Sequence, residues 1–113
     1  MDRPKALLRT IQRKDKSYKA LMFVCPGCVA GGPDGYDGLH LLAVNSNVYR
    51  PSWDWDGNLE RPTLSPSILT TGYSRCHSFL KNGIFTFLGD SDHPLVGQEV
   101  EIPELPEWVL NLE

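Results

Sequence analysis

The chain has 113 residues and a formal net charge of −3, and 22% of its residues are charged. This length suits one small domain over residues 1–113, and no apolar run approaches the ~20 residues that a membrane helix needs, so we expect no membrane partner. Three cysteines are an odd number and no apolar leader precedes them, which argues against a secreted disulfide framework and favours the reducing cytoplasm.

The charges are unevenly distributed along the chain. Residues 82–113 contain seven acids and neither Lys nor Arg, and the segment 104–113 reads as an acidic tail. Seven of the eleven basic residues lie before residue 20: Arg3, Lys5, Arg9, Arg13, Lys14, Lys16 and Lys19. This pattern fits two solvated edges of a small domain, or a basic N-terminal segment over residues 1–24 that binds nucleic acid.

Several short segments have the pattern of β-strands. Residues 5–12 fit either an amphipathic helix or the first arm of a hairpin that turns at 14–17 and returns along 18–24, and the polar turn favours the hairpin. A Gly-rich loop at 31–38 precedes an apolar strand at 40–44.

The central segment carries Trp53 and Trp55, whose spacing places both indoles on one face of a strand. Two partly apolar rings on one face are expected either in the core or on a surface that stacks a partner's base or peptide. Asp56 and Gly57 predict a hairpin turn that returns through residues 58–61. Two prolines make residues 62–67 an extended segment that is unsuited to a central strand.

The remaining segments also predict strands. A strand is expected at 67–71, and residues 76–88 form the clearest hairpin because Asn82 and Gly83 suit a type I′ turn. Residues 98–102 alternate as a half-exposed strand does, and 104–112 predict a helical turn or an extended tail. Together these segments predict a mainly β fold of small antiparallel hairpins, stapled by a zinc knuckle.

A metal site is predicted around Cys25 and Cys28. Pro26 and Gly27 lie between them and suit a tight turn that brings both thiolates together. Cys76 offers a third thiolate, and a tetrahedral zinc needs a histidine as fourth ligand. His40 is favoured because it lies soon after the knuckle, with His93 as the substitute. A redox dithiol and unrelated buried thiols are the alternatives. A redox pair usually opens a helix, whereas a loop is expected after this pair.

Strand alternation makes His77 the weakest candidate for this ligand set, unless the backbone bends there. If the side chain of Cys76 points inward, that of His77 points away, because adjacent residues in a strand face opposite sides. This leaves a second group of His77, Asp90 and His93, with Ser67 and Thr63 as possible neighbours. A carboxylate that orients an imidazole suggests a metal-dependent hydrolase, but the sequence offers no complete triad by motif.

The motifs resemble a family of small uncharacterised phage and bacterial proteins, sometimes labelled ammonia monooxygenases. The lack of spanning segments argues against that label. Eleven residues separate Cys28 from His40, more than is usual in the family. The matching motifs are Cys25-Pro26-Gly27-Cys28, His40, Trp53 and Trp55, Pro62 to Ser67, Cys76-His77-Ser78-Phe79, Asn82-Gly83, and Asp90 to Gly97.

These observations favour a zinc-stabilised phage or bacterial accessory protein that binds a host protein in the cytoplasm. The role and the setting of such a partner come from the resemblance alone, with Trp53 and Trp55 as the candidate contact surface. Enzymatic activity is left open. The hydrolase with His77, Asp90 and His93 is the first alternative, and nucleic-acid binding through the basic N-terminal segment is the second.

Overall fold

Two antiparallel sheets and two short helices make up the computed structural model, which describes residues 3–111. The first sheet has the order β1 (Ala6–Arg13), β2 (Lys16–Val24) and β3 (Leu39–Ala43). The second has the order β4 (Asp54–Trp55), β5 (Leu64–Thr70), β6 (Cys76–Lys81), β7 (Ile84–Phe87) and β8 (Glu99–Glu101). The helices are α1 (Pro26–Gly31) and α2 (Glu107–Leu110). The predicted mainly β fold is confirmed.

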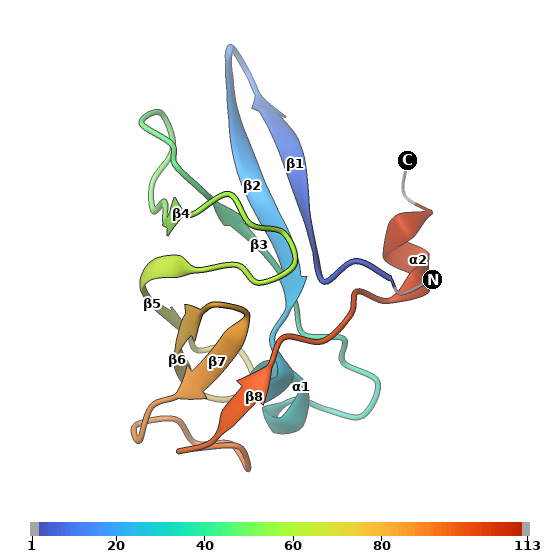
Figure 1. The fold of residues 1–113 in the computed structure, drawn as a ribbon, viewed down its shortest axis with the longest axis vertical. Helices are drawn as coiled ribbons and strands as arrows, with labels where there is room; N and C mark the ends of the chain where they lie inside the picture. The colour runs from blue at the N-terminus through green and yellow to red at the C-terminus, as the bar shows by residue number, and fades with distance from the viewer. Residues whose placement is uncertain (1–2, 112–113) are drawn as a thin grey trace.

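The N-terminal segment forms the β1–β2 hairpin, so the helical alternative is wrong. The strands pair from Ala6↔Phe23 to Arg13↔Lys16, and Lys14 in the two-residue turn has a φ of 54°. Figure 1 shows this hairpin rising beyond the rest of the molecule. Its outer half carries four of the hairpin's five basic side chains, Arg13, Lys14, Lys16 and Lys19. Its base joins the core through the fully buried Leu21 and Phe23.

Strand β5 begins earlier than predicted and lies between β4 and β6. Leu64 and Ser65 pair with β4, while Ile68 to Thr70 pair with β6, and the register shifts between Leu64 and Ile68. Pro66 lies in this irregular stretch, where its lack of an N–H removes no regular ladder bond. The expectation that the prolines make a central strand unlikely here was therefore wrong.

The hairpin predicted at Asp56 and Gly57 does not form as expected. Residues 58–61 do not return as a strand; the loop is held by side chains, with the Asn58 carboxamide oxygen accepting from the N–H groups of Glu60 and Arg61. The strand that pairs with β4 starts only at Leu64.

Both sheets share one core. Phe23 from β2 contacts Phe85 from β7 with ring centroids 6.0 Å apart, and Leu64 and Leu80 are buried in the same cluster. The predicted β6–β7 hairpin is present, with Asn82 and Gly83 at φ of 52° and 75°.

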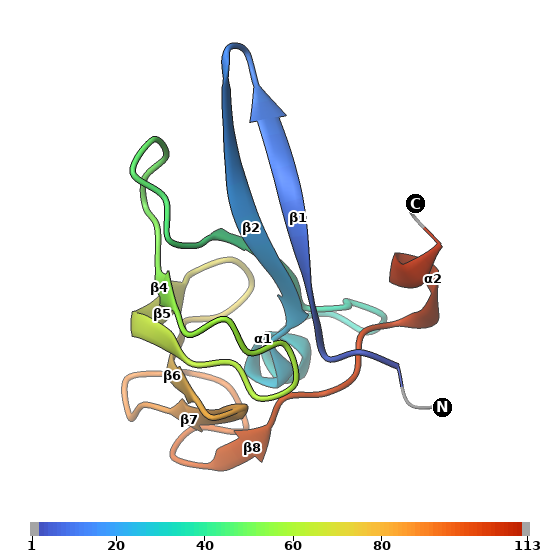
Figure 2. The same cartoon turned by 45° about the horizontal axis from the view of Figure 1, so that its top comes forward.

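The C-terminal segment returns to the N-terminal one, as Figures 1 and 2 show. The N–H of Leu105 donates to the carbonyl of Pro4 at 2.8 Å, and Val109 of α2 packs with Met22 and Val24 in a second apolar cluster. In residues 3–111 no helix has the length and apolarity to cross a membrane.

Candidate active site and metal centre

The turn after β2 brings the first two cysteines to the end of the sheet. Cys25 is the N-cap of α1, and its N–H donates to the carbonyl of Gly38 at 3.0 Å. Gly38 has a φ of +61°, and a Cβ there would lie 2.9 Å from the carbonyl oxygen of Cys25, so only glycine fits without strain. The short helix α1 follows Cys25, where the sequence predicted a loop.

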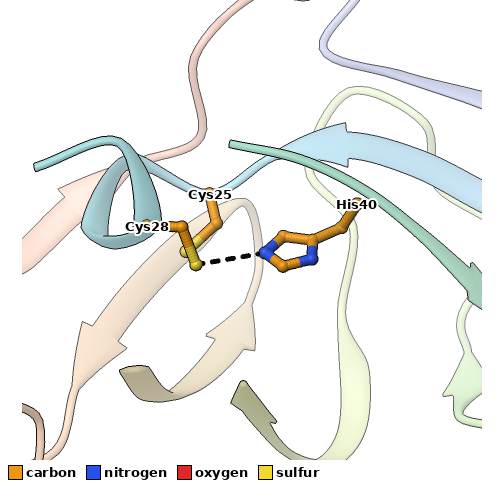
Figure 3. A group of neighbouring side chains, drawn as sticks. All are labelled: Cys25, Cys28 and His40. Carbon is orange, nitrogen blue, oxygen red and sulfur yellow. Dashed lines mark hydrogen bonds between the residues drawn. The ribbon is translucent and has the colours of Figure 1, made fainter. Parts of the chain in front are cut away.

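Two thiols and one imidazole meet beside this turn, and the Cys76 thiol adjoins this group through its contact with Cys25. The ligand atoms of Cys25, Cys28 and His40 all lie within 4.8 Å of one another. The Cys28 sulfur lies 3.2 Å from Nε2 of His40 (Figure 3), and the Cys25 sulfur lies 3.7 Å from that of Cys76. Two thiolates on one tetrahedral zinc are about 3.8 Å apart, given Zn–S bonds of about 2.3 Å. The spacing therefore fits a shared metal.

The three thiols are buried and interact with one another. Hydrogen bonds from the Cys25 and Cys76 thiols lower the pKa of Cys28, and the contact with Cys28 raises the pKa of Cys25. All three side chains are at most 9% exposed. A buried thiolate without a counter-charge is costly, so a divalent cation suits this donor set. We call Cys25, Cys28, His40 and Cys76 the metal centre.

The structure separates the three histidines. His40 lies with the thiols, as favoured, whereas His93 packs edge-on against Phe87 with ring centroids 4.9 Å apart. Nδ1 of His93 accepts from the N–H of Leu95 at 3.2 Å, and His93 is not part of the Cys–His group found among residues 3–111. Its expected roles, as substitute metal ligand and as a partner of His77, have no support in this geometry.

His77 points away from the metal centre into a second site. Its Nε2 lies 2.9 Å from Oγ of Ser67, and its Nδ1 lies 3.1 Å from both carboxylate oxygens of Asp90. When Nδ1 carries the ring proton, the Nδ1–H group donates to the carboxylate. Nε2 then accepts a hydrogen bond from the hydroxyl of Ser67. Ser67, His77 and Asp90 thus form a hydrogen-bonded chain with the connectivity of a catalytic triad, and we call them the triad.

Sheet register explains this arrangement. Leu69 pairs with His77, and Ile68 pairs with Ser78. Ile68 and Ser78 are buried, so Ser67, His77 and the half-exposed Leu69 lie on the outer face. The triad is therefore accessible to solvent.

A short loop after β7 supplies the carboxylate and is fastened to β6. The Ser91 hydroxyl donates to the carbonyl of His77 at 3.1 Å and accepts its N–H at 3.0 Å. The N–H of Asp92 donates to the carbonyl of Arg75 at 2.9 Å, and the Asp92 carboxylate accepts the N–H of Arg75 at 2.7 Å. These bonds fix Asp90 beside His77.

Ser67 is the residue whose role the sequence did not identify. It was named only as a possible neighbour of His77, and the motif Ser65-Pro66-Ser67 offers two serines without a signature that distinguishes them. The irregular stretch of β5 sets which one faces His77. Thr63 has another role, since its hydroxyl accepts the N–H of Asn82 at 2.8 Å.

The predicted contact surface of two tryptophans is half-buried. Trp53 and Trp55 pack against the shared core, and the indole N–H of Trp53 donates to the carbonyl of Ser67 at 3.2 Å. The indole of Trp55 donates to the carbonyl of Asn58 at 3.1 Å. Trp53 thus supports the backbone of the triad serine.

Comparison with known families shows the family to which the chain belongs. The family model described as "Bacterial ubiquitination-like system serine protease (BubE)" matches residues 2–88. The chain belongs to the BubE family. The match includes Ser67, His77 and the whole metal centre, and it ends two residues before Asp90. No curated protein and no solved structure matches the chain.

Proposed function

We propose that this BubE-family chain is a serine protease that cleaves amide or isopeptide bonds in a bacterial ubiquitination-like system. The observation that carries the proposal is the chain of hydrogen bonds from Ser67 through His77 to Asp90, at 2.9 and 3.1 Å. The family description supports the same chemistry. A binding role alone, which the sequence favoured, gives no reason for these three side chains to be aligned on an exposed face.

The reaction follows from the placement of the protons. His77 Nε2 takes the hydroxyl proton as Oγ of Ser67 attacks the acyl carbon of the substrate. The imidazolium is stabilised by Asp90, and it gives that proton to the departing amine as the C–N bond breaks. A water then attacks the acyl-Ser67 ester while His77 again accepts the proton, which releases a carboxylate and restores the serine.

We infer that the metal centre holds zinc with a structural role. Cys25, Cys28, Cys76 and His40 provide three sulfur donors and one nitrogen donor, a set typical of structural zinc sites. Four protein ligands leave no position for a substrate. When bound, the ion cross-links the end of β2, β3 and the start of β6, the strand that also carries His77.

A fluorophosphonate probe tests the proposal because it reacts only with an activated serine. We expect the wild-type chain to be labelled at Ser67, as located by mass spectrometry of the digested adduct. The Ser67→Ala variant should lose labelling, and its hydrolysis of an activated ester should fall about a thousandfold or more. Ser65→Ala is the matched control, since Ser65 is an exposed serine in the same segment.

Cleavage of a conjugate gives the second measurement. A ubiquitin-like protein joined to a lysine side chain should be released by the wild-type chain and by Ser65→Ala, but not by Ser67→Ala. Equal activity of the Ser67→Ala and wild-type chains in both assays would contradict the proposed function.

A further inference from the structure

Asp90 is unusually open to water for the acid of a triad. Its side chain is 44% exposed, whereas that of His77 is 24% exposed. The acid of a serine protease triad is ordinarily buried, where fixed hydrogen bonds set the direction of the carboxylate. An exposed carboxylate rotates and exchanges its partners with water, so another group must hold it in place.

Arg75 supplies such a group. Its Nε and Nη2 atoms both donate to Oδ2 of Asp90, at 3.2 and 3.0 Å. Nδ1 of His77 lies on the same carboxylate, so three N–H groups converge on it. The guanidinium is planar and rigid, so its two N–H groups hold the Oδ2 oxygen from a fixed direction, which a single point charge does not.

The backbone of Arg75 is anchored independently of its side chain. Its N–H and carbonyl are both bonded to Asp92, two residues beyond Asp90. The guanidinium therefore reaches Asp90 from a fixed base. A change of side chain at this position leaves the two backbone bonds intact.

We propose that Arg75 is a positioning residue for hydrolysis, which holds Asp90 in the orientation that receives the Nδ1 proton of His77. The proposal rests on the proposed function. Arg75 does not contact Ser67 and acts only through the carboxylate. The same contact lowers the pKa of Asp90, with Arg75 as the largest cause and His77 as the next, which is the direction that a fixed cation produces.

Loss of the fork lowers the rate of the chemical step. We expect Arg75→Gln to reduce kcat about tenfold, the loss of one charge-assisted hydrogen-bonded contact, with KM unchanged, as expected of a residue that acts only through Asp90. Arg75→Lys keeps the charge without the fork, so we expect it to recover about half of that loss on a logarithmic scale.

The experiment compares four full-length, metal-loaded variants with the wild-type chain. Arg75→Gln, Arg75→Lys, Ser67→Ala and Lys81→Gln are assayed for kcat and KM with p-nitrophenyl acetate, together with metal content and Tm. Lys81→Gln is the matched control, because Lys81 is an exposed cation at the far end of β6. It should retain the wild-type kcat. Unchanged kcat in Arg75→Gln overturns the proposal, and so does a fall in kcat that is matched by lost metal or a lowered Tm.

A second readout does not depend on turnover. The Nδ1 proton of His77 should give a downfield proton resonance in the wild-type chain and in Lys81→Gln, and it should broaden through faster exchange with water in Arg75→Gln. If this resonance is the same in Arg75→Gln, Arg75 does not position Asp90, even where Ser67 is the nucleophile. If Ser67→Ala hydrolyses the ester as fast as the wild-type chain, it is the proposed function that fails.

Discussion

Cys76 and His77 are neighbours in β6, yet they belong to two regions with opposite physical character. The thiols of the metal centre are buried, with exposures of 9% or less, whereas the triad faces water and its carboxylate is 44% exposed. Interactions in the dry region contribute strongly to folding, because an unpaired buried charge is costly. Those in the wet region contribute little to folding but lie on the face where the proposed function would place a protein substrate. One strand thus carries the buried Cys76 of the metal centre on one face and the partly exposed triad histidine on the other.

Replacing Cys76 and His77 one at a time should give the largest contrast between the metal centre and the triad. We expect Cys76→Ser to lose the metal and the cooperative unfolding transition, because structural zinc contributes on the order of 10 kcal/mol in small modules. His77→Ala should keep both the metal and the fold while losing hydrolysis. Metal analysis and circular dichroism during heating measure these outcomes. A Cys76→Ser chain that melts near the wild-type temperature with its metal bound would show that the two faces are not divided in this way.

The wet region should respond in activity rather than in stability. Asp90→Asn is expected to reduce kcat by about 10⁴-fold, the loss seen when the acid of a triad becomes an amide. The Tm should change by no more than a few degrees, since an exposed ion pair contributes only about 0–1 kcal/mol. Steady-state kinetics and thermal melts give both quantities. Asp56→Asn serves as the control, because Asp56 is an exposed acid in the β4–β5 loop. A large loss of Tm with unchanged kcat would reverse our assignment.

The turn that supports the metal centre should be sensitive to one methyl group. Gly38→Ala is expected to destabilise the fold by about 2 kcal/mol, from the positive φ and from contact with the Cys25 carbonyl. Gly35→Ala is the control, since Gly35 also has a positive φ, of 84°, but its Cβ would meet nothing within 4 Å. Urea unfolding should give a larger loss for Gly38→Ala than for Gly35→Ala. Equal losses would mean that backbone strain alone matters and the approach to Cys25 does not.

The hydrogen bonds that hold the Asp90 loop to β6 should give the smallest effect. Ser91→Ala removes a buried hydroxyl that bonds both the N–H and the carbonyl of His77, and we expect a loss of about 1 kcal/mol. For a domain of this size the Tm should fall by about 4–8 °C. Ser17→Ala, at an exposed position of β2, should leave the Tm unchanged. An unchanged Tm in Ser91→Ala would mean that water replaces the hydroxyl.

Local rules predicted that Cys25, Cys28 and His40 lie together. The Cys-x-x-Cys turn and a third cysteine indicated a metal site, and proximity along the chain favoured His40 as a ligand. Strand alternation predicted that Cys76 points inward and His77 outward. The Asn82-Gly83 hairpin was also predictable, because its positive φ values suit only a few residue types. Each of these inferences depends on a few neighbouring residues or on a simple period.

The triad needed information that no local rule contains. Ser67 meets His77 because the register of β5 shifts between Leu64 and Ile68, and a shift of one residue would present the other face of the strand. Asp90 reaches His77 through a loop whose shape depends on Ser91 and Asp92. The helix after Cys25 was missed because Pro26 at the first helical position also suits a turn.

The sharing of β6 between the metal centre and the triad has a practical consequence for classification by inhibitors. A strong chelator that removes the metal from the thiols would free the start of β6, the strand that also carries His77. Hydrolysis would then stop, although the proposed reaction uses no metal. A fluorophosphonate would stop the same activity by reacting with Ser67. A conventional inhibitor panel would thus classify the chain both as a metalloprotease and as a serine protease. A structural metal would be distinguished from a catalytic one because the chelator would unfold the chain before activity is lost.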